Sequence, residues 1–146
     1  MRRGLLAFAI GVLAVAAVIL SWELVQGRTF PVGQEYGAVA LNGTRFDDRS
    51  RTLVLMRRDL GHVIVAYAGC NWFGGYVTFL VGGLYVIRES WMTAGYCGAK
   101  NDTEKVFFDA LLRTKHWRIS GERLVLVGLS DVLQFEPVVK KKEAMQ

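Results

Sequence analysis

Short runs of β-branched or alternating apolar residues recur from Tyr36 onward, and turn residues separate them. The turns come about 8–12 residues apart, a spacing that is typical of an antiparallel sandwich or barrel. The runs that we predict as strands are 38–41, 52–56, 62–68, 76–81, 84–87, 117–120, 123–127 and 132–136. The predicted turns between them include Asn42-Gly43, Gly82-Gly83 and Gly121-Glu122.

One segment, residues 101–115 (NDTEKVFFDALLRTK), departs from the alternation. Its apolar residues at helical spacing are Phe107, Phe108, Ala110, Leu111 and Leu112. Asp102 or Thr103 is the candidate N-cap of this helix. A single amphipathic helix between strands must bury its apolar face against the sheet. We therefore predict a mainly β (α+β) fold, a cracked antiparallel β-barrel or twisted sheet with one amphipathic helix packed on it.

The first thirty residues have the form of an export signal. Arg2 and Arg3 precede an uncharged apolar run over residues 5–20, and the next charged residue is Glu23. A helix over residues 4–22 would be about 28 Å long, enough to cross a hydrocarbon core about 30 Å thick. Residues 1–27 are therefore predicted to be a cleaved signal peptide or a retained transmembrane anchor, with a buried core helix as the third reading.

The remaining boundaries follow from composition. Residues 28–35, with Pro31 and Gly33, are predicted as a linker, residues 36–138 as the β-barrel domain, and residues 139–146 as a basic tail. The tail, with its three lysines at 140–142, is either a solvated end or a weak attachment to anionic lipid head groups.

The net charge of +5 lies at the two ends of the chain, in Arg2, Arg3 and the lysines at 140–142, so the body is formally neutral. A neutral body argues against a nucleic-acid-binding face, which needs clustered Lys and Arg. A hydrophobic content of 52% excludes a disordered chain. Two Cys and two His leave little material for a metal site or a nucleophile–base pair, so we expect neither a cofactor nor enzymatic activity.

An ordered series of residues runs through the body of the chain. It consists of Gly69-Cys70-Asn71, Gly75-Tyr76, Thr93 with Cys97, Glu104 with Phe107 and Leu111, and Trp117 with Gly121, Leu124 and Leu126. In this order the series resembles the META domain, the HslJ-like heat-shock family of cell-envelope proteins. The resemblance covers about residues 36–138. It departs from the family in the first strand, which lacks the usual tryptophan, and at Gly95, where a methionine is usual.

This resemblance implies a cracked antiparallel β-barrel closed by one helix, similar to pilotins of type III secretion that hold lipid or a hydrophobic peptide. No catalytic activity is established for the family. Together with the export signal, it implies a cell-envelope location. The domain would be anchored in the inner membrane and face the periplasm, or would be periplasmic or secreted if the signal is cleaved.

Cys70 and Cys97 are the two cysteines of the chain. In an oxidising compartment we expect them to be bridged, and closing the loop between them would contribute about 3–4 kcal/mol. Two buried free thiols, or a redox or metal role, are the alternatives. The neighbouring Asn71 is expected to tolerate a left-handed backbone or to cap a turn, rather than to act in catalysis.

Aromatic residues are densest between residues 72 and 91, and most of them must fill the barrel. An aromatic groove at the open seam between barrel and helix would receive an acyl chain or an apolar peptide segment. The candidate ligand residues are Trp72, Phe73, Tyr85, Trp91, Phe107, Phe108 and Leu111. The leading hypothesis is a binding or accessory module in envelope stress or secretion. The alternative is a structural or assembly protein of the envelope with no ligand cavity.

Overall fold

The computed structural model describes residues 30–47, 50–58 and 61–139. The chain divides into Met1–Phe30 and Pro31–Gln146, and all elements described belong to the second unit. The predicted signal or anchor segment over residues 1–27 lies outside the described residues, as do residues 140–146 of the tail. Within the described ranges, no helix combines the length and the apolar character that crossing a membrane requires.

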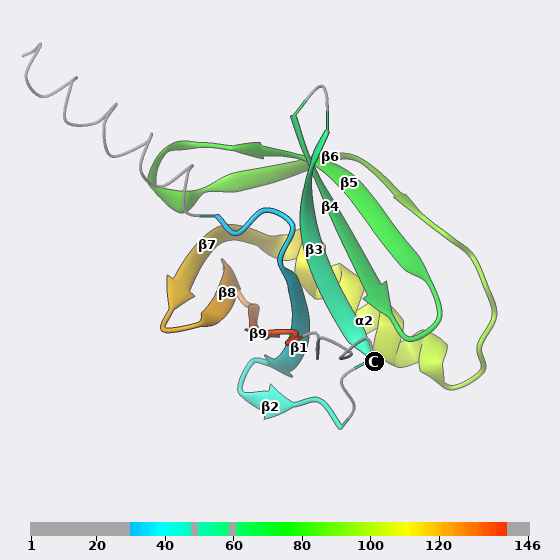
Figure 1. The fold of residues 1–146 in the computed structure, drawn as a ribbon. Helices are drawn as coiled ribbons and strands as arrows, with labels where there is room; N and C mark the ends of the chain where they lie inside the picture. The colour runs from blue at the N-terminus through cyan, green and yellow to red at the C-terminus, as the bar shows by residue number, and fades with distance from the viewer. Residues whose placement is uncertain (1–29, 48–49, 59–60, 140–146) are drawn as a thin grey trace, which may run out of the picture. The chain divides into compact units, whose positions relative to one another are not determined.

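The described residues form a strongly curved antiparallel sheet with α2 (Lys100–Arg113) against it (Figure 1). The strands are β1 (Glu35–Leu41), β2 (Thr44–Arg45), β3 (Arg51–Arg58), β4 (Gly61–Ala68), β5 (Trp72–Phe79), β6 (Tyr85–Met92), β7 (Thr114–Ser120), β8 (Arg123–Gly128) and β9 (Val132–Pro137). Their order in the sheet is β6-β5-β4-β3-β1-β9-β8-β7, with β2 paired to β1. The predicted fold class, mainly β with one helix packed on the sheet, is confirmed.

The barrel is cracked between its two edge strands. Within the described residues, β6 and β7 lie at opposite ends of the strand order, and a single bridge between Leu84 and His116 joins these two edges. The helix α2 contacts β4, β7, β8 and β9, so it packs across both sides of this opening. A seam therefore runs between the C-terminal end of β6 and the helix.

Alternation along the strands builds the core. In β3, Leu53 and Leu55 are 1% exposed, while the residues that alternate with them, at positions 52, 54 and 56, are only partly buried. The helix contributes Phe107 and Leu111, both fully buried. The ring of Phe107 packs edge-on against Phe135 of β9, with the ring centroids 6.3 Å apart. Each such buried side chain stabilises the fold by about 1.5–3 kcal/mol.

The middle hairpin differs from its predicted limits. The strand β5 begins at Trp72 rather than at residue 76, and β6 continues to Met92. The turn at 82–83 is part of a short 3₁₀ turn, η1 (Val81–Gly83). Gly74 lies within β5, where a Cβ atom would be 2.2 Å from Cζ2 of Trp91. Close packing of the indole against the backbone therefore requires glycine there.

The helix also differs from its predicted limits. It begins at Lys100 with Ala99 as N-cap, and no side chain caps it, so the predicted cap at Asp102 or Thr103 is wrong. The Thr103 hydroxyl instead donates to the carbonyl oxygen of Lys100, at 3.0 Å. The helix ends at Arg113 because β7 starts at the next residue and begins pairing with the end of β8 there.

Substitution of Gly128, the last residue of β8, tests the close contact between this strand and the end of the helix. A Cβ atom there would lie 2.6 Å from the carbonyl oxygen of Arg113, a backbone atom that no rotamer change can move. We expect Gly128→Ala to lower the free energy of unfolding by about 1–3 kcal/mol, measured by chemical denaturation. The control is Gly37→Ala, because the nearest atom to its Cβ would be 3.7 Å away. Equal losses in both variants would contradict this account.

Candidate functional site

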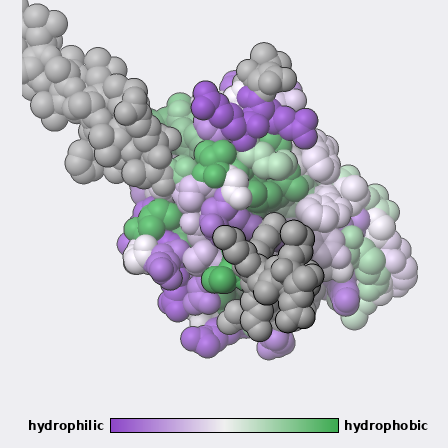
Figure 2. Space-filling model, in the orientation of Figure 1, coloured by the Kyte–Doolittle hydropathy of each residue, from purple (hydrophilic) through white to green (hydrophobic). Residues whose placement is uncertain are grey.

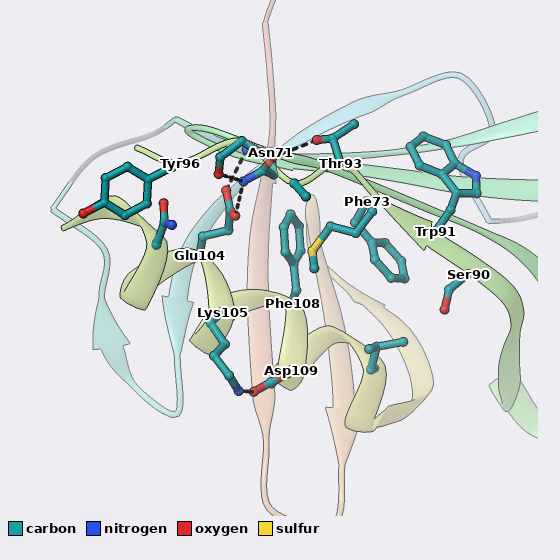
Figure 3. A pocket seen from close by; sticks show the side chains of 15 residues that line it. Asn71, Phe73, Ser90, Trp91, Thr93, Tyr96, Glu104, Lys105, Phe108 and Asp109 are labelled. Atoms are coloured by element: carbon teal, nitrogen blue, oxygen red, sulfur yellow. Dashed lines mark hydrogen bonds and ion pairs between the residues drawn. The ribbon is translucent and has the colours of Figure 1, made fainter. Parts of the chain in front are cut away.

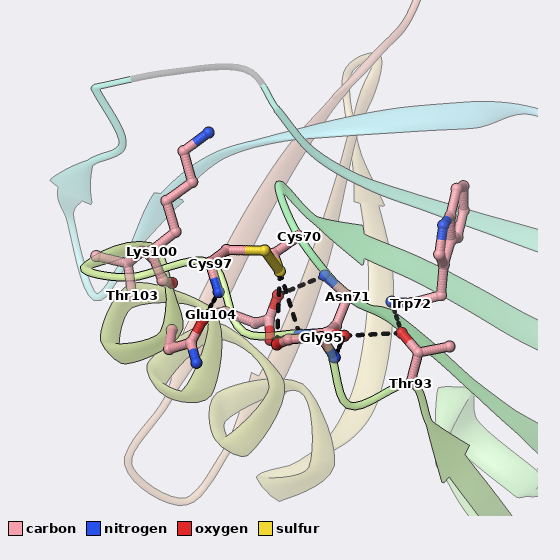
Figure 4. The surroundings of a disulfide bond; sticks show 10 residues. Cys70, Asn71, Trp72, Thr93, Gly95, Cys97, Lys100, Thr103 and Glu104 are labelled. Atoms are coloured by element: carbon pink, nitrogen blue, oxygen red, sulfur yellow. Dashed lines mark hydrogen bonds between the residues drawn. A yellow bond between two sulfur atoms is a disulfide. The ribbon is translucent and has the colours of Figure 1, made fainter.

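A disulfide joins Cys70 to Cys97, with their Cα atoms 6.1 Å apart (Figure 4). Cys70 lies in the turn between β4 and β5, and Cys97 lies in the segment 93–99 that leads from β6 into α2. The bond therefore ties this irregular segment to the end of the barrel. The disulfide predicted from the sequence is confirmed, and the alternative of two free thiols is excluded.

Asn71 is the centre of a hydrogen-bond network beside the disulfide (Figure 4). Its side-chain amide donates to Oε1 of Glu104 at 2.6 Å and to the carbonyl oxygen of Gly95 at 3.0 Å. Its Oδ1 accepts from the Gly95 amide at 2.6 Å and from the Thr93 hydroxyl at 2.9 Å. Asn71 is only 4% exposed. The left-handed backbone expected there occurs instead at Gly69, with a φ of 93°.

Glu104 carries a carboxylate that is buried at the first turns of α2. Its Oε2 accepts from the backbone amide of Asn71 at 2.6 Å, in addition to the side-chain bond of Oε1. Hydrogen bonds to an ionised acceptor are about twice as strong as neutral ones. These two bonds fix the helix to the β4–β5 turn, and the bonds of Asn71 to Gly95 fix the segment 93–97 between them.

A cavity of about 620 Å³ opens along the seam, and we call it the seam groove (Figure 3). It lies between the end of β6, the segment 93–96 and one face of α2. Its apolar lining consists of Phe73, Trp91, Met92, Ala94, Tyr96, Phe108 and Leu112. Phe73 and Phe108 meet across the seam with ring centroids 5.6 Å apart. The groove therefore has an aromatic floor contributed by both the sheet and the helix.

Polar side chains surround this floor. Lys105 and Asp109 form an ion pair of 2.6 Å, with the side chain of Lys105 largely exposed. Large apolar side chains are also open to solvent at the groove, since Trp91 is 50% and Met92 58% exposed. An apolar floor with a few polar groups at its edge is the usual form of a site for small or extended apolar ligands.

The predicted ligand residues separate into three groups. Phe73, Trp91 and Phe108 line the seam groove. Tyr85, Phe107 and Leu111 are buried in the barrel interior. Trp72 stands apart, because it packs on Tyr67 of β4 and belongs to no wall of the groove.

Tyr85 is buried in the core and is not accessible to a ligand in the groove. Its hydroxyl is hydrogen-bonded to that of Thr114 at 2.5 Å, and burial raises the pKa of Tyr85 above its ordinary value.

The residues of the family series also divide. Asn71, Thr93 and Glu104 come together with the disulfide in one network. Trp117 contacts Phe79 inside the barrel, with ring centroids 6.2 Å apart. The remaining members are placed by the backbone: Gly75 and Tyr76 lie within β5, and Gly69 and Gly121 lie in turns with a positive φ.

Sequence reasoning missed part of the groove. Met92, Gly95 and Tyr96 line it but were not among the predicted ligand residues. They belong to the end of β6 and to a segment without regular periodicity, so no pattern marked them. Leu112 was recognisable only as part of the apolar face of the helix.

The described residues offer no constellation for metal binding, because no three His, Cys, Asp or Glu side chains among them are grouped to hold an ion. The seam groove provides apolar surface and hydrogen-bonding groups.

Comparison with protein families gives a match to the META domain over residues 29–140. Three solved structures share the fold. One of them, an NMR structure of a protein from Burkholderia xenovorans, has a TM-score of 0.60 and 19% identity, covering 75% of this chain and 84% of that one. Another, a crystal structure of a DUF4847 family protein from Bacteroides vulgatus, has a TM-score of 0.51 and 12% identity, covering 77% and 97%. No curated protein matches the chain.

Glu104→Gln tests the link between the helix and the β4–β5 turn. In glutamine an NH2 group replaces one of the two accepting oxygens, so one N–H group of Asn71 would face another donor and lose its partner. We expect the free energy of unfolding to fall by about 1–3 kcal/mol in chemical denaturation. Asp109→Asn on the same helix is the control, because it removes only an exposed ion pair worth under about 0.5 kcal/mol. Similar losses of unfolding free energy in both variants would show that the hydrogen bonds of Glu104 stabilise the fold no more than an exposed ion pair does.

Replacing both cysteines by serine tests the disulfide. The bond closes a loop with a sequence separation of 27, so we expect Cys70→Ser/Cys97→Ser to lose about 3–4 kcal/mol of unfolding free energy. The wild-type protein under reducing conditions should unfold at the same denaturant concentration as the variant. A loss below about 1 kcal/mol would mean that the hydrogen bonds of Asn71 hold the segment without the disulfide.

Proposed function

Because the chain belongs to the META domain family, we propose that it is an exported, non-enzymatic envelope protein that binds an apolar ligand segment in its seam groove. Two observations support export. The first 27 residues have the composition of a signal or anchor, and a disulfide is typical of an oxidising compartment such as the periplasm. The domain would face the periplasm, either tethered to the inner membrane or free after cleavage.

The observation that carries the binding function is the aromatic floor of the seam groove. Its volume of about 620 Å³ is within the usual size of a ligand site. Trp91 and Met92 remain half-exposed at this floor, although the neighbouring Phe73 is buried. A cluster of large apolar side chains left open to water is typical of a binding surface. An acyl chain or an apolar peptide segment laid along the groove would cover them.

The wall formed by residues 93–97 is held in place before any ligand arrives. The disulfide holds it at Cys97, and both the amide and the carbonyl of Gly95 are hydrogen-bonded to Asn71. A preformed wall lowers the entropic cost of binding. We infer that the network around Asn71 serves the groove by keeping it open in one shape.

Quenching of tryptophan fluorescence by a bromine-labelled dodecanoate tests this function on the full chain. Saturable quenching is expected, and Trp91→Phe should remove most of it because Trp91 lines the groove. Trp72→Phe is the matched control, since Trp72 has a similar exposure, 47% against 50%, but lies outside the groove. If both variants lost the same share of the quenching, the probe would not occupy the groove.

A charge in the floor provides the second half of the test. Leu112→Glu places a carboxylate where the acyl chain would lie, and we expect the Kd for the probe to rise at least about tenfold. Val106→Glu adds the same charge on an exposed position of the same helix outside the groove and should change the Kd by less than about twofold. A wild-type protein without saturable quenching would favour the assembly role instead.

A further inference from the structure

Three aliphatic side chains are exposed together at the turn between β5 and β6. Leu80, Val81 and Leu84 are 49%, 56% and 45% exposed; Val81 begins η1, and Leu80 and Leu84 flank it. We call these three residues the aliphatic tip. None of them lines the seam groove, so the binding function proposed above does not explain them.

Basic side chains lie on both sides of this tip. On one side are Arg57 and Arg58 of β3, both exposed. Arg57 is paired with His62, and the His62 ring contacts Phe79, the residue before Leu80, with ring centroids 5.3 Å apart. Figure 2 shows a hydrophilic band at the top of the view, with apolar side chains directly below it.

The other side of the tip is formed by β7. Leu84 is bridged to His116, and the exposed Lys115 and Arg118 lie on either side of His116 along the strand. The strands β3, β4, β5 and β7 and the turn 80–84 contain no Asp or Glu. The acids that adjoin these elements in sequence are Asp48 before β3, Asp59 in the β3–β4 connection and Glu122 in the β7–β8 turn, and β6 contains Glu89. The surface around the tip therefore combines aliphatic groups with an excess of positive charge.

Both ends of the described domain lie near the start of β1, where β1 pairs with β3. The backbone amide of Gly33 donates to the carbonyl oxygen of Leu55, two residues before Arg57. The amide of Val138 donates to the carbonyl of Glu35, at the beginning of β1. Gly33 and Val138, near the two ends of the described domain, therefore both lie beside the start of β1, next to the part of β3 that leads to Arg57.

We propose that the aliphatic tip and the arginines beside it form a surface that rests on a bilayer containing anionic lipid. Exposed aliphatic groups enter the interface, while cations bind anionic head groups. The sequence leaves eight residues between Trp22 and Pro31, which span at most about 29 Å when extended. A tethered domain thus stays close enough to the membrane for this contact. The proposal rests on the envelope location proposed above but is independent of a ligand in the seam groove.

Depth measurement of a fluorescent label tests the contact on the full chain in nanodiscs. Val81→Cys supplies a single free thiol, because the native cysteines are bridged. Its label should be quenched by nitroxide-labelled lipid in discs of phosphatidylcholine with about 30% phosphatidylglycerol. The matched control is Leu129→Cys, an exposed leucine in the β8–β9 turn, near the end of β1 rather than its start. We expect quenching at Val81 to exceed that at Leu129 by at least about threefold.

Charge reversal completes the test. Arg57→Glu/Arg58→Glu should reduce quenching at Val81 to the level of Leu129, and the milder Arg57→Gln/Arg58→Gln should reduce it in part. Equal quenching at Val81 and Leu129 would overturn the proposal, as would quenching that is unchanged when phosphatidylglycerol is omitted. Titration of the same proteins with bromododecanoate reports the seam groove separately, so failure of the membrane contact and failure of the binding function give different results.

Discussion

A buried carboxylate holds this fold together at the point where the helix meets the sheet. Glu104 and Asn71 are 33 residues apart in sequence, yet both oxygens of the carboxylate accept hydrogen bonds from Asn71. Since a buried charge is costly unless it is hydrogen-bonded, this pairing fixes where α2 can begin. The position of the helix then decides how much of the opening between β6 and β7 is covered and how much remains as a groove.

The groove is thus a consequence of incomplete closure. An antiparallel barrel that closed fully would pair β6 with β7 along their length and leave no edge. Here one bridge, between Leu84 and His116, joins them within the described residues, and the helix fills only part of the gap. Gly74 allows the indole of Trp91 to lie against β5. The result is an aromatic floor that neither the sheet nor the helix could bury alone.

The sequence allows most of the elements to be predicted, and fewer of the site residues. Alternation identified the strands because one face of each is buried, and the Phe/Leu spacing identified the helix. The start of β5 and the end of β6 were not predicted, because the pair Gly74-Gly75 is typical of a turn in sequence. In the structure both glycines lie within β5, where they leave room for side chains of β6. The hydrogen bonds between Asn71 and Glu104 could not be predicted either, since no local sequence pattern indicates a contact between residues 33 positions apart. Whether an aromatic ring lines the groove or fills the core depends on the bulge in β6, where Glu89 has a φ of 49°.

The position of the disulfide has a consequence for the order of folding. The loop that it closes contains the whole of β5 and β6, which pair locally. The strands β1 and β9, by contrast, come from opposite ends of the domain, and their meeting carries the larger loop-closure entropy. Oxidation can therefore trap a native hairpin together with the residues that precede the helix while the two ends of the domain are still apart. An oxidant acting on the folding chain would then select the native registration of β5 and β6 ahead of final closure.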